Sequence, residues 1–184
     1  MCICVKKWHK REAVNKIPLR NTGKSRERKV RALSFFGTSQ NNIDLKGRVS
    51  IPVKYRSALG PSFIVTIGFD KCLCVYTYEQ WEILEKQLRK LSSTKKDMRD
   101  FTRYLFAGAS EVELDKQGRI LIPANLREFA ELEKEVTILG VNNRIEIWNR
   151  ERWEIRNKET AARFNEIGEN LINFDVDFDD EDDA

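Results

Sequence analysis

The sequence predicts an α+β fold made of two tandem half-domains, each containing short strands followed by helices. One observation is a phrase that occurs twice: IDLKGRVSIP at 43–52 returns as LDKQGRILIP at 114–123, an offset of 71 residues. A second is that VTIGFDKCLCVYTYEQW at 65–81 matches VTILGVNNRIEIWNRERW at 136–153. Two copies separated by so long a period are typical of a duplicated half-domain and not of a solenoid.

Each copy is expected to run strand, strand, helix, strand, strand, helix. A three-residue loop ending in Gly47 joins the first two strands into a hairpin, as in a type I turn followed by a left-handed residue. The next segment, 49–51, alternates apolar and polar residues, which predicts a strand with one buried face. Pro52 ends that strand and suits the first turn of a helix. Gly118 and Pro123 repeat these signals in the second copy.

The rest of each copy is expected to supply two more strands and a helix. In the first copy the strands fall at 63–67 and 73–76, and Thr77 opens a capping box that begins a helix. Thr94 begins a linking helix in the same way, and Asn149 caps a longer helix in the second copy. Apolar stripes on these helices predict core or subunit contacts, and their members are Trp81, Leu84, Leu88 and Leu91, then Met98, Phe101, Thr102 and Leu105, then Trp153, Phe164, Ile167 and Leu171.

Composition bounds the class of protein. The chain has 184 residues, of which 41% are hydrophobic, so one domain or two small ones with a packed core are expected. No apolar run approaches the length of about eighteen residues that a membrane helix needs, and the first residues lack the order of a secretory signal. We therefore expect a soluble, cytoplasmic protein without a membrane partner or a small-molecule substrate.

The four cysteines form two C-x-C pairs, Cys2 with Cys4 and Cys72 with Cys74. A disulfide framework is typical of secreted chains, and zinc sites more often use C-x-x-C turns. The interpretation is that Cys72 and Cys74 lie on one face of a strand and pack as small hydrophobic residues. We expect neither a metal site nor a cofactor.

Charge is concentrated at the two ends of the chain. Residues 1–34 carry a net charge of +9 and residues 175–183 carry −7, whereas residues 35–174 carry +2. Such an arrangement is typical of an interaction protein; alternatively, both ends are solvated, disordered segments. The expected organisation is a disordered basic extension at 1–34, a first repeat with its helix at 35–92, a linking helix at 93–108, a second repeat at 109–157, a C-terminal helix at 158–174 and a disordered acidic tail at 175–184.

The repeated polar residues indicate a nucleic-acid interface. If the half-domains pack about a pseudo-twofold axis, Arg48 and Arg119 form a symmetric pair beside the glycine turns. A guanidinium fits phosphate oxygens or the O6/N7 edge of guanine, and Asp44 or Asp115 is positioned to hold it in place. Duplex DNA, itself twofold symmetric, is a suitable partner. The candidate DNA-binding residues are Lys46, Arg48, Lys54, Arg56, Lys116, Arg119 and Arg127, and the motif-supporting residues are Asp44, Gly47, Pro52, Asp115, Gly118 and Pro123.

Two other readings of the motif stay open. Asp44 and Asp115 form a candidate carboxylate dyad for catalysis, although the arginine four residues after each lowers a carboxyl pKa and opposes proton sharing. The only histidine, His9, lies in the basic extension, and no Ser-His-Asp set, P-loop or dinucleotide fingerprint is present, so the sequence does not favour an enzyme. The motif is alternatively a hairpin that an Asp–Arg pair merely locks, which leaves the recurrence of Arg56 at Arg127 less well explained.

The tract from Asp44 to Arg56 resembles the DNA-binding half of AbrB-type swapped-hairpin regulators. Two such units in one chain, with FFGTSQNNIDLKGRVSIP opening the first and GVNNRIEIWNRERW closing the second, resemble the bacterial MraZ family over about residues 35–171. The resemblance implies a double-split β-α-β fold, an AbrB-like swapped-hairpin barrel formed by the two tandem repeats, with flanking helices.

The resemblance also implies a function. It implies a nucleoid-associated transcriptional regulator that binds repeated boxes in its own promoter, upstream of the division and cell-wall gene cluster, and assembles into a ring-shaped homo-oligomer. Arg48 and Arg119 would contact DNA, with the two helical arginines as support. The second repeat departs where Leu121 replaces Ser50 and Asn125 replaces Lys54, which makes the first face the more basic. The alternative is an AbrB-like antitoxin or interaction scaffold whose partner is a protein.

Overall fold

The computed structural model describes residues 34–91 and 94–172. The basic extension expected at 1–34, apart from Ser34, and the acidic tail expected at 175–184 lie outside the described residues. Within those residues, no helix combines the length and the apolar character that a membrane crossing requires.

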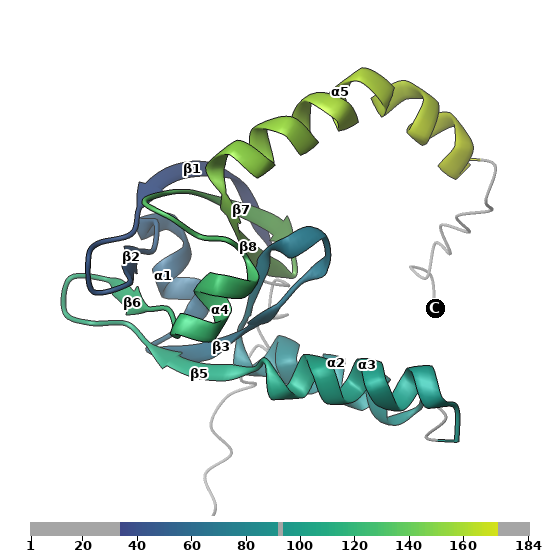
Figure 1. Ribbon diagram of the computed structural model, residues 1–184, viewed down its shortest axis with the longest axis horizontal. Helices are drawn as coiled ribbons and strands as arrows, with labels where there is room; N and C mark the ends of the chain where they lie inside the picture. Colours follow the sequence, from purple (N-terminus) through teal and green to yellow (C-terminus); the bar gives the residue numbers. More distant parts are fainter. Residues whose placement is uncertain (1–33, 92–93, 173–184) are drawn as a thin grey trace, which may run out of the picture. The chain divides into compact units, whose positions relative to one another are not determined.

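Each repeat contributes four strands and its own helices, and α3 links the two halves (Figure 1). In chain order the elements are β1 (Phe35–Asn42), β2 (Arg48–Ser50), α1 (Val53–Leu59), β3 (Ser62–Ile67), the 3₁₀ helix η1 (Phe69–Lys71), β4 (Leu73–Tyr76), α2 (Tyr78–Arg89), α3 (Lys96–Ala107), β5 (Ser110–Glu113), β6 (Arg119–Leu121), α4 (Ala124–Phe129), β7 (Glu135–Asn142), β8 (Arg144–Asn149) and α5 (Arg150–Ile172).

Strands of the two repeats share one six-stranded antiparallel sheet of order β1-β7-β8-β4-β3-β5. The hairpins β3–β4 and β7–β8 meet at its centre, where β4 pairs with β8. The first strand of each repeat pairs with the third strand of the other repeat, β1 with β7 and β5 with β3. The second strands, β2 and β6, pair as a separate two-stranded ribbon. The two repeats are therefore interlocked, because each completes the sheet of the other.

This arrangement confirms the predicted α+β class and the construction from two repeats. Across the described residues the sheet stays open, with β1 and β5 at its edges, so the strand pairing forms no closed barrel. The predicted hairpin of the first two strands is reduced to a single bridge between Ile43 and Val49. The reason is that β1 pairs along its whole length with β7.

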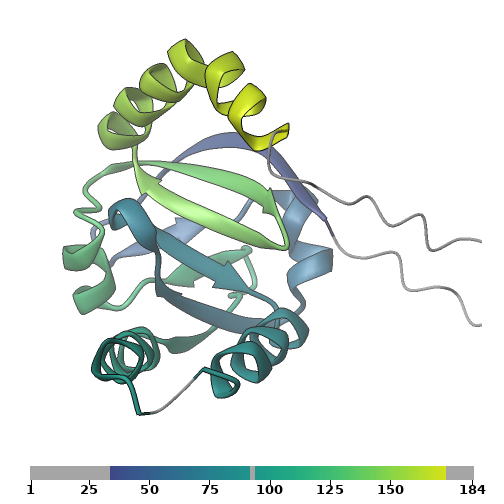
Figure 2. The same cartoon turned by 90° about the vertical axis from the view of Figure 1, so that its right-hand side faces the viewer.

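A pseudo-twofold axis relates the two repeats. In the ribbon it passes through the pair of Val49 and Ile120, which are equivalent positions in the repeated phrase. In the sheet it passes through Cys74 and Glu146, which face each other across β4 and β8. In Figure 2 the helices α1 (blue) and α4 (green) flank the strands at the right and the left of the view, as this symmetry requires.

Strand register corrects one part of the repeat alignment. Val65 pairs with Ser110. Ser39, which is the equivalent of Ser110 in the first repeat, pairs with Ile138. Val65 therefore corresponds to Ile138 and not to Val136, because the second repeat has a longer connection between α4 and β7 than the first has between α1 and β3.

Alternation along the strands divides the apolar residues between two faces of the sheet. One face packs with the ribbon and with α1 and α4 into the main core, whose fully buried side chains include Ile120, Ile138 and Ile147. The other face carries a smaller cluster. Cys72 and Cys74 are buried there, Cys74 within β4 and Cys72 directly before it. The other buried members of this cluster are Leu139 and Trp148.

The helices begin at or near the predicted caps. The Gln80 N–H donates a hydrogen bond to Thr77 Oγ1 (3.2 Å) at the start of α2, and Asn149 caps α5 in the same way. The linking helix α3 has Lys95 as its N-cap, one residue after the predicted Thr94. The expected boundary at residue 157 lies inside α5, which is continuous.

The predicted apolar stripes are confirmed only in part. Trp81 is buried and Leu84 and Leu88 are half-buried, so the stripe of α2 packs as predicted over its first turns. Leu91 lies beyond the end of α2 and is exposed, which corrects its predicted burial. Phe164 is also exposed, because α5 projects past the sheet that its first turns contact (Figure 1).

Each short helix holds the turn of the other repeat. The guanidinium of Arg56 in α1 lies against Gly118, and that of Arg127 in α4 lies against Gly47. Each Nε donates a hydrogen bond to a backbone carbonyl of its own repeat, at 2.7 Å and 3.2 Å. Both glycines have left-handed backbones, with φ of 74° and 82°. Glycine is thus required at each turn for its conformation and also for the space above it.

We expect Gly118→Ala to destabilise the fold more in the parent than in the Arg56→Ala variant. Gly118 has a φ of 74°, which costs about 1–2 kcal/mol for a residue with a Cβ in either background, but the added methyl overlaps the Arg56 guanidinium only in the parent. Urea unfolding followed by circular dichroism measures the two losses. Equal losses in the two backgrounds would contradict the interlock.

Candidate nucleic-acid interface

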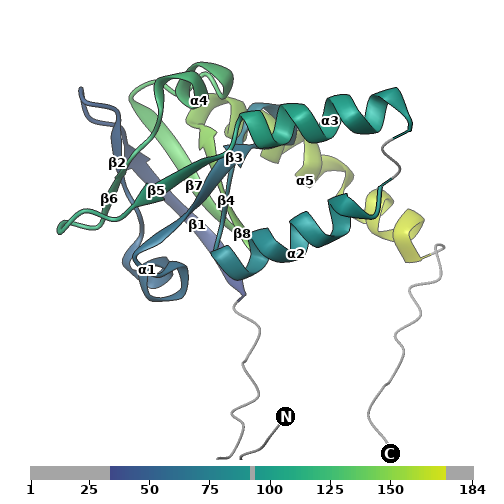
Figure 3. The ribbon, with the colours of Figure 1, turned by 90° about the horizontal axis from the view of Figure 1, so that it is seen from below.

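The outer face of the β2–β6 ribbon carries the two predicted arginines. The central pair of this ribbon points into the core, so the residues on either side of it point outward. Strand register places Arg48 across from Leu121 and Arg119 across from Ser50. The ribbon lies at the end of the fold away from α2 and α3 (Figure 3). The two arginines therefore occupy diagonal positions on one exposed surface.

Asp44 anchors the first arginine. One carboxylate oxygen accepts hydrogen bonds from the backbone N–H groups of Lys46 (2.9 Å) and Arg48 (3.0 Å). The other accepts from Arg48 Nε at 2.8 Å and lies 2.8 Å from its Nη2. The Gly47 N–H donates to the Asp44 carbonyl and closes the turn (2.8 Å). A single aspartate thus holds both the backbone of the turn and the guanidinium at its end.

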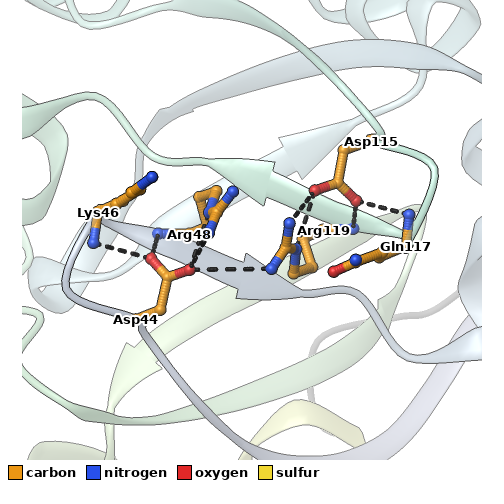
Figure 4. Close-up of polar contacts among 6 residues, drawn as sticks. All are labelled: Asp44, Lys46, Arg48, Asp115, Gln117 and Arg119. Atoms are coloured by element: carbon orange, nitrogen blue, oxygen red, sulfur yellow. Dashed lines mark hydrogen bonds and ion pairs between the residues drawn. The ribbon is translucent and has the colours of Figure 1, made fainter.

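Asp115 repeats this geometry in the second turn. Its Oδ1 accepts from the N–H groups of Gln117 (2.8 Å) and Arg119 (2.9 Å), and its Oδ2 accepts from Arg119 Nε (2.8 Å) and Nη2 (2.7 Å). Arg119 Nη1 also lies 4.0 Å from Asp44 Oδ2 in the other repeat. Figure 4 shows the two aspartate–arginine units side by side on the ribbon. The polar network therefore crosses the pseudo-twofold axis.

Electrostatics keep both carboxylates ionised. Hydrogen bonds from the backbone N–H and then from the guanidinium of Arg48 lower the pKa of Asp44. The corresponding groups of Arg119 lower the pKa of Asp115 to about 2. Each carboxylate has its own arginine, so the two do not share a proton as a catalytic dyad requires. The aspartates orient the arginines and do not form an acid–base pair.

The anchored arginines keep donor capacity for a ligand. The side chains of Arg48 and Arg119 are 31% and 24% exposed. Their aspartates take up Nε and Nη2, and among the described residues Arg48 Nη1 takes part in no hydrogen bond or ion pair. A planar guanidinium fixed at one edge presents its remaining N–H groups in a defined direction, which suits phosphate oxygens or a base edge.

The structure gathers the predicted residues unequally. The exposed side chains of Lys46 and Lys116 lie in the two turns beside the arginine pair. Arg56 and Arg127 lie beneath the turns, against the glycines. Lys54 lies elsewhere: its ammonium donates to the Phe36 carbonyl (3.2 Å), and within the described part of the chain no contact joins it to either ribbon arginine.

Other residues of this surface have no counterpart among the predicted ones. Leu45 is fully exposed at the tip of the first turn, and Leu121 is 57% exposed on the ribbon. Asn41 Nδ2 donates to the Ser50 carbonyl (3.1 Å) and ties β1 to the ribbon. Leu121 stands out in the sequence as the apolar residue at the position of Ser50, and Leu45 could have been noticed as an apolar residue in a polar turn. The contact of Asn41 depends on tertiary structure.

The construction from two tandem repeats agrees with a family match that occurs twice along the chain. A family model described as "MraZ protein, putative antitoxin-like" matches residues 34–104 and again residues 105–175. The chain belongs to the MraZ family. The resemblance noted in the sequence is thereby confirmed, and the two matches correspond to the two halves of the fold.

Two curated relatives illustrate how far the similarity extends in the MraZ family. Both are named Transcriptional regulator MraZ. The relative from Natranaerobius thermophilus is 46% identical over 142 residues, which are 77% of this chain and 99% of that protein. The relative from Caldanaerobacter subterraneus subsp. tengcongensis is 51% identical over the same number of residues and the same shares of the two chains.

We expect the Asp115 carboxyl to titrate with a midpoint of about 2 in the folded protein. The carbon chemical shift of the carboxyl group, measured by NMR over a range of pH, gives this midpoint. In Arg119→Ala the midpoint should rise but stay below the ordinary 3.8, because the backbone N–H, the larger contribution, remains. Since the pKa is depressed in the folded state, the stabilisation is present above the unfolded pKa and is lost as the pH falls from 3.8 toward 2.

The matched control for this titration is Arg48→Ala, which removes the same side chain from the other turn. The Asp115 midpoint should be unchanged in that variant, because Arg48 makes its hydrogen bonds to Asp44. A full return of the midpoint to 3.8 in Arg119→Ala would contradict a leading contribution from the backbone.

Proposed function

We propose that this chain is a transcriptional regulator that binds duplex DNA with the outer face of the β2–β6 ribbon. The observation that carries the proposal is the pair of aspartate-anchored arginines, Arg48 and Arg119, related by the pseudo-twofold axis. The name that both curated relatives bear, Transcriptional regulator MraZ, supports the same function.

The anchoring favours base reading by the arginines. Because an aspartate offsets the charge of each guanidinium, Arg48 and Arg119 add little net positive charge, but their directed N–H groups suit the O6/N7 edge of guanine. Preorganisation reduces the side-chain entropy that binding would otherwise cost. Lys46 and Lys116, which lie exposed beside them, supply the charge that attracts phosphates.

The remaining predicted residues have supporting roles in this proposal. Arg56 and Arg127 hold the turns from below and act on DNA through the geometry of the ribbon. Lys54 adds positive charge to the first repeat only, since the second repeat has Asn125 at the equivalent position. The two halves of the interface are therefore expected to differ in strength.

The finer features of the proposal rest on family resemblance. The exchange of β1 and β5 between repeats supports an intramolecular counterpart of the AbrB-like swapped-hairpin barrel. The proposed target is a set of repeated boxes in the promoter of the protein's own operon, upstream of the division and cell-wall gene cluster. Such a regulator would work in the cytoplasm, associated with the nucleoid.

A ring-shaped homo-oligomer is part of the same proposal. The sheet has two open edges, β1 and β5, and open edges favour association with further chains. Exposed apolar side chains on β1 and α5, namely Phe36, Ile155 and Phe164, add surface for such contacts.

Light scattering of the purified full chain should give a mass of several subunits; a mass of one chain would contradict the ring.

A second candidate function is binding to a protein partner. The family description contains the words "antitoxin-like", which favours an antitoxin or interaction scaffold. In that case the chain would form a stoichiometric complex with a protein and would not distinguish its promoter from unrelated DNA. The DNA-binding measurement below separates this candidate from the first.

We expect Arg48→Ala and Arg119→Ala each to lose on the order of 1–3 kcal/mol of discrimination between promoter DNA and a scrambled duplex. Fluorescence anisotropy over a range of salt concentrations measures the discrimination and the salt slope together. Lys46→Ala should instead weaken both duplexes alike and reduce the slope by about one unit.

The matched control is Arg89→Ala, which removes an equal charge from the exposed end of α2. It should bind both duplexes as the parent does. Parental discrimination in both ribbon variants would overturn the proposed mechanism, and thermal unfolding of every variant checks that the fold is intact.

A further inference from the structure

The face of the sheet that points away from the ribbon brings together three metal-ligating side chains. Cys72 and Cys74 come from the first repeat and Glu146 from the second, and Cys74 stands directly across from Glu146 in the pairing of β4 with β8. All three residues are buried, and the two Sγ atoms and a carboxylate oxygen lie within 4.8 Å of one another.

We propose that Cys72, Cys74 and Glu146 bind a divalent transition-metal ion of the zinc type. Two thiolates with one carboxylate form a donor set that favours such an ion over magnesium or calcium. Zinc bonds of roughly 2.0–2.3 Å place tetrahedral ligand atoms about 3–4 Å apart, so the observed spacing needs only small side-chain adjustments. The fourth position is left for water or a small ligand.

Local backbone geometry makes the C-x-C spacing suitable here. Residues two apart in an extended segment point to the same side, so both thiols face Glu146. They also converge over Gly68: a Cβ at that position would lie 2.7 Å from each Sγ. The Cys72 Sγ lies 3.1 Å from the Phe69 carbonyl oxygen, which fixes its direction. A C-x-x-C turn is therefore not needed, because the third ligand comes from the neighbouring strand.

Neighbouring side chains orient the carboxylate. Arg144 donates to Glu146 Oε1 through Nε (2.9 Å) and Nη2 (2.7 Å), and the Trp148 indole N–H donates to Oε2 (3.0 Å). Hydrogen bonds of this kind commonly hold carboxylate ligands in place around protein-bound metals. The carboxylate is thus fixed with its charge beside the thiols.

The charge balance also suits a divalent ion. With neutral thiols, the ion pair between half-buried Arg144 and buried Glu146 has no net charge. A divalent cation that displaces the protons of both thiols restores that zero balance, since two thiolates, one carboxylate and one guanidinium sum with it to zero. The exchange releases two protons and oxidises nothing, so affinity should increase with pH.

A cavity gives an ion a route to these ligands. It has a volume of about 460 Å³ and is lined by Cys72, Cys74 and Glu146 on the sheet side. Apolar side chains of α2 and α3 form much of the opposite wall, including Leu84, Phe101 and Leu105. Such walls limit the access of bulk water and strengthen the interaction of a bound ion with its ligands.

The test is a titration of cobalt(II), a spectroscopic substitute for zinc, into the purified full chain kept reduced with a non-thiol reductant. We expect one equivalent per chain to give the near-ultraviolet charge-transfer band of thiolate coordination and the visible bands of four-coordinate cobalt, and zinc to abolish both. Cys72→Ser and Cys74→Ser should each lose the charge-transfer band at this equivalence, and Glu146→Gln should weaken binding at least tenfold.

The chain offers its own matched controls. Cys2→Ser/Cys4→Ser removes the other C-x-C pair and should bind cobalt as the parent does. Arg89→Gln removes an exposed positive charge from α2 without removing a ligand or a hydrogen-bond partner of one, and it should also bind cobalt as the parent does. No charge-transfer band in the parent, or a band that is lost only in the Cys2/Cys4 variant, would overturn the proposal.

A second measurement avoids any variant that fails to fold. The parent is alkylated with and without zinc, and each cysteine is followed by peptide mass spectrometry. Zinc should slow alkylation of Cys72 and Cys74 but leave the rates at Cys2 and Cys4 unchanged. Equal rates with and without zinc at Cys72 and Cys74 would contradict the site. The outcome is independent of DNA binding, since no residue of the ribbon takes part.

Discussion

The pairing of Val49 with Ile120 on the pseudo-twofold axis is the contact on which the arrangement of the two repeats depends. Both side chains are buried in the main core, so the ribbon cannot slip by one residue without turning them to solvent. The same register brings each glycine turn against an arginine from the other repeat. Ribbon, turns and short helices are therefore coupled. The aspartate–arginine units consequently have fixed relative positions within one chain, without a dimer having to form.

Features that depend on a few neighbouring residues could be predicted, and features that depend on strand partners could not. Gly47 and Asp44 determine their turn by local conformation and hydrogen bonding, and that turn is found as predicted. An alternating strand does not specify its partner, so the pairing of β1 with β7 instead of β2 was beyond the sequence patterns. The same limit applies to Glu146, whose position beside Cys74 arises only from the pairing of β8 with β4. Spacing within the C-x-C motif alone had therefore argued against a metal site.

The two faces of the fold use the repeat in different ways. On the ribbon, the repeated motif is kept in both copies, and the hydrogen bonds of Asp44 are reproduced at Asp115 almost atom for atom. On the far face of the sheet, the equivalent positions differ: Cys74 corresponds to Glu146 on the axis itself. A partner with twofold symmetry can make the same contacts with equivalent residues of the two repeats. The identical motifs on the ribbon therefore agree with DNA as its proposed ligand. No such requirement applies to the far face.

Joining the two repeats in one chain allows two different residues to meet on the twofold axis. In a symmetric dimer of identical subunits, a residue on the axis meets only itself. Two copies of Glu146 there would place two negative charges against each other in a buried position. Two copies of Cys74 would have no carboxylate beside them to act as a third ligand. Because the repeats are joined, a thiol can face a carboxylate across the axis, with Arg144 beside them to balance the charge. The mixed donor set therefore depends on having both repeats in one chain: the ribbon keeps the same residues at equivalent positions of the two repeats, and the opposite face does not.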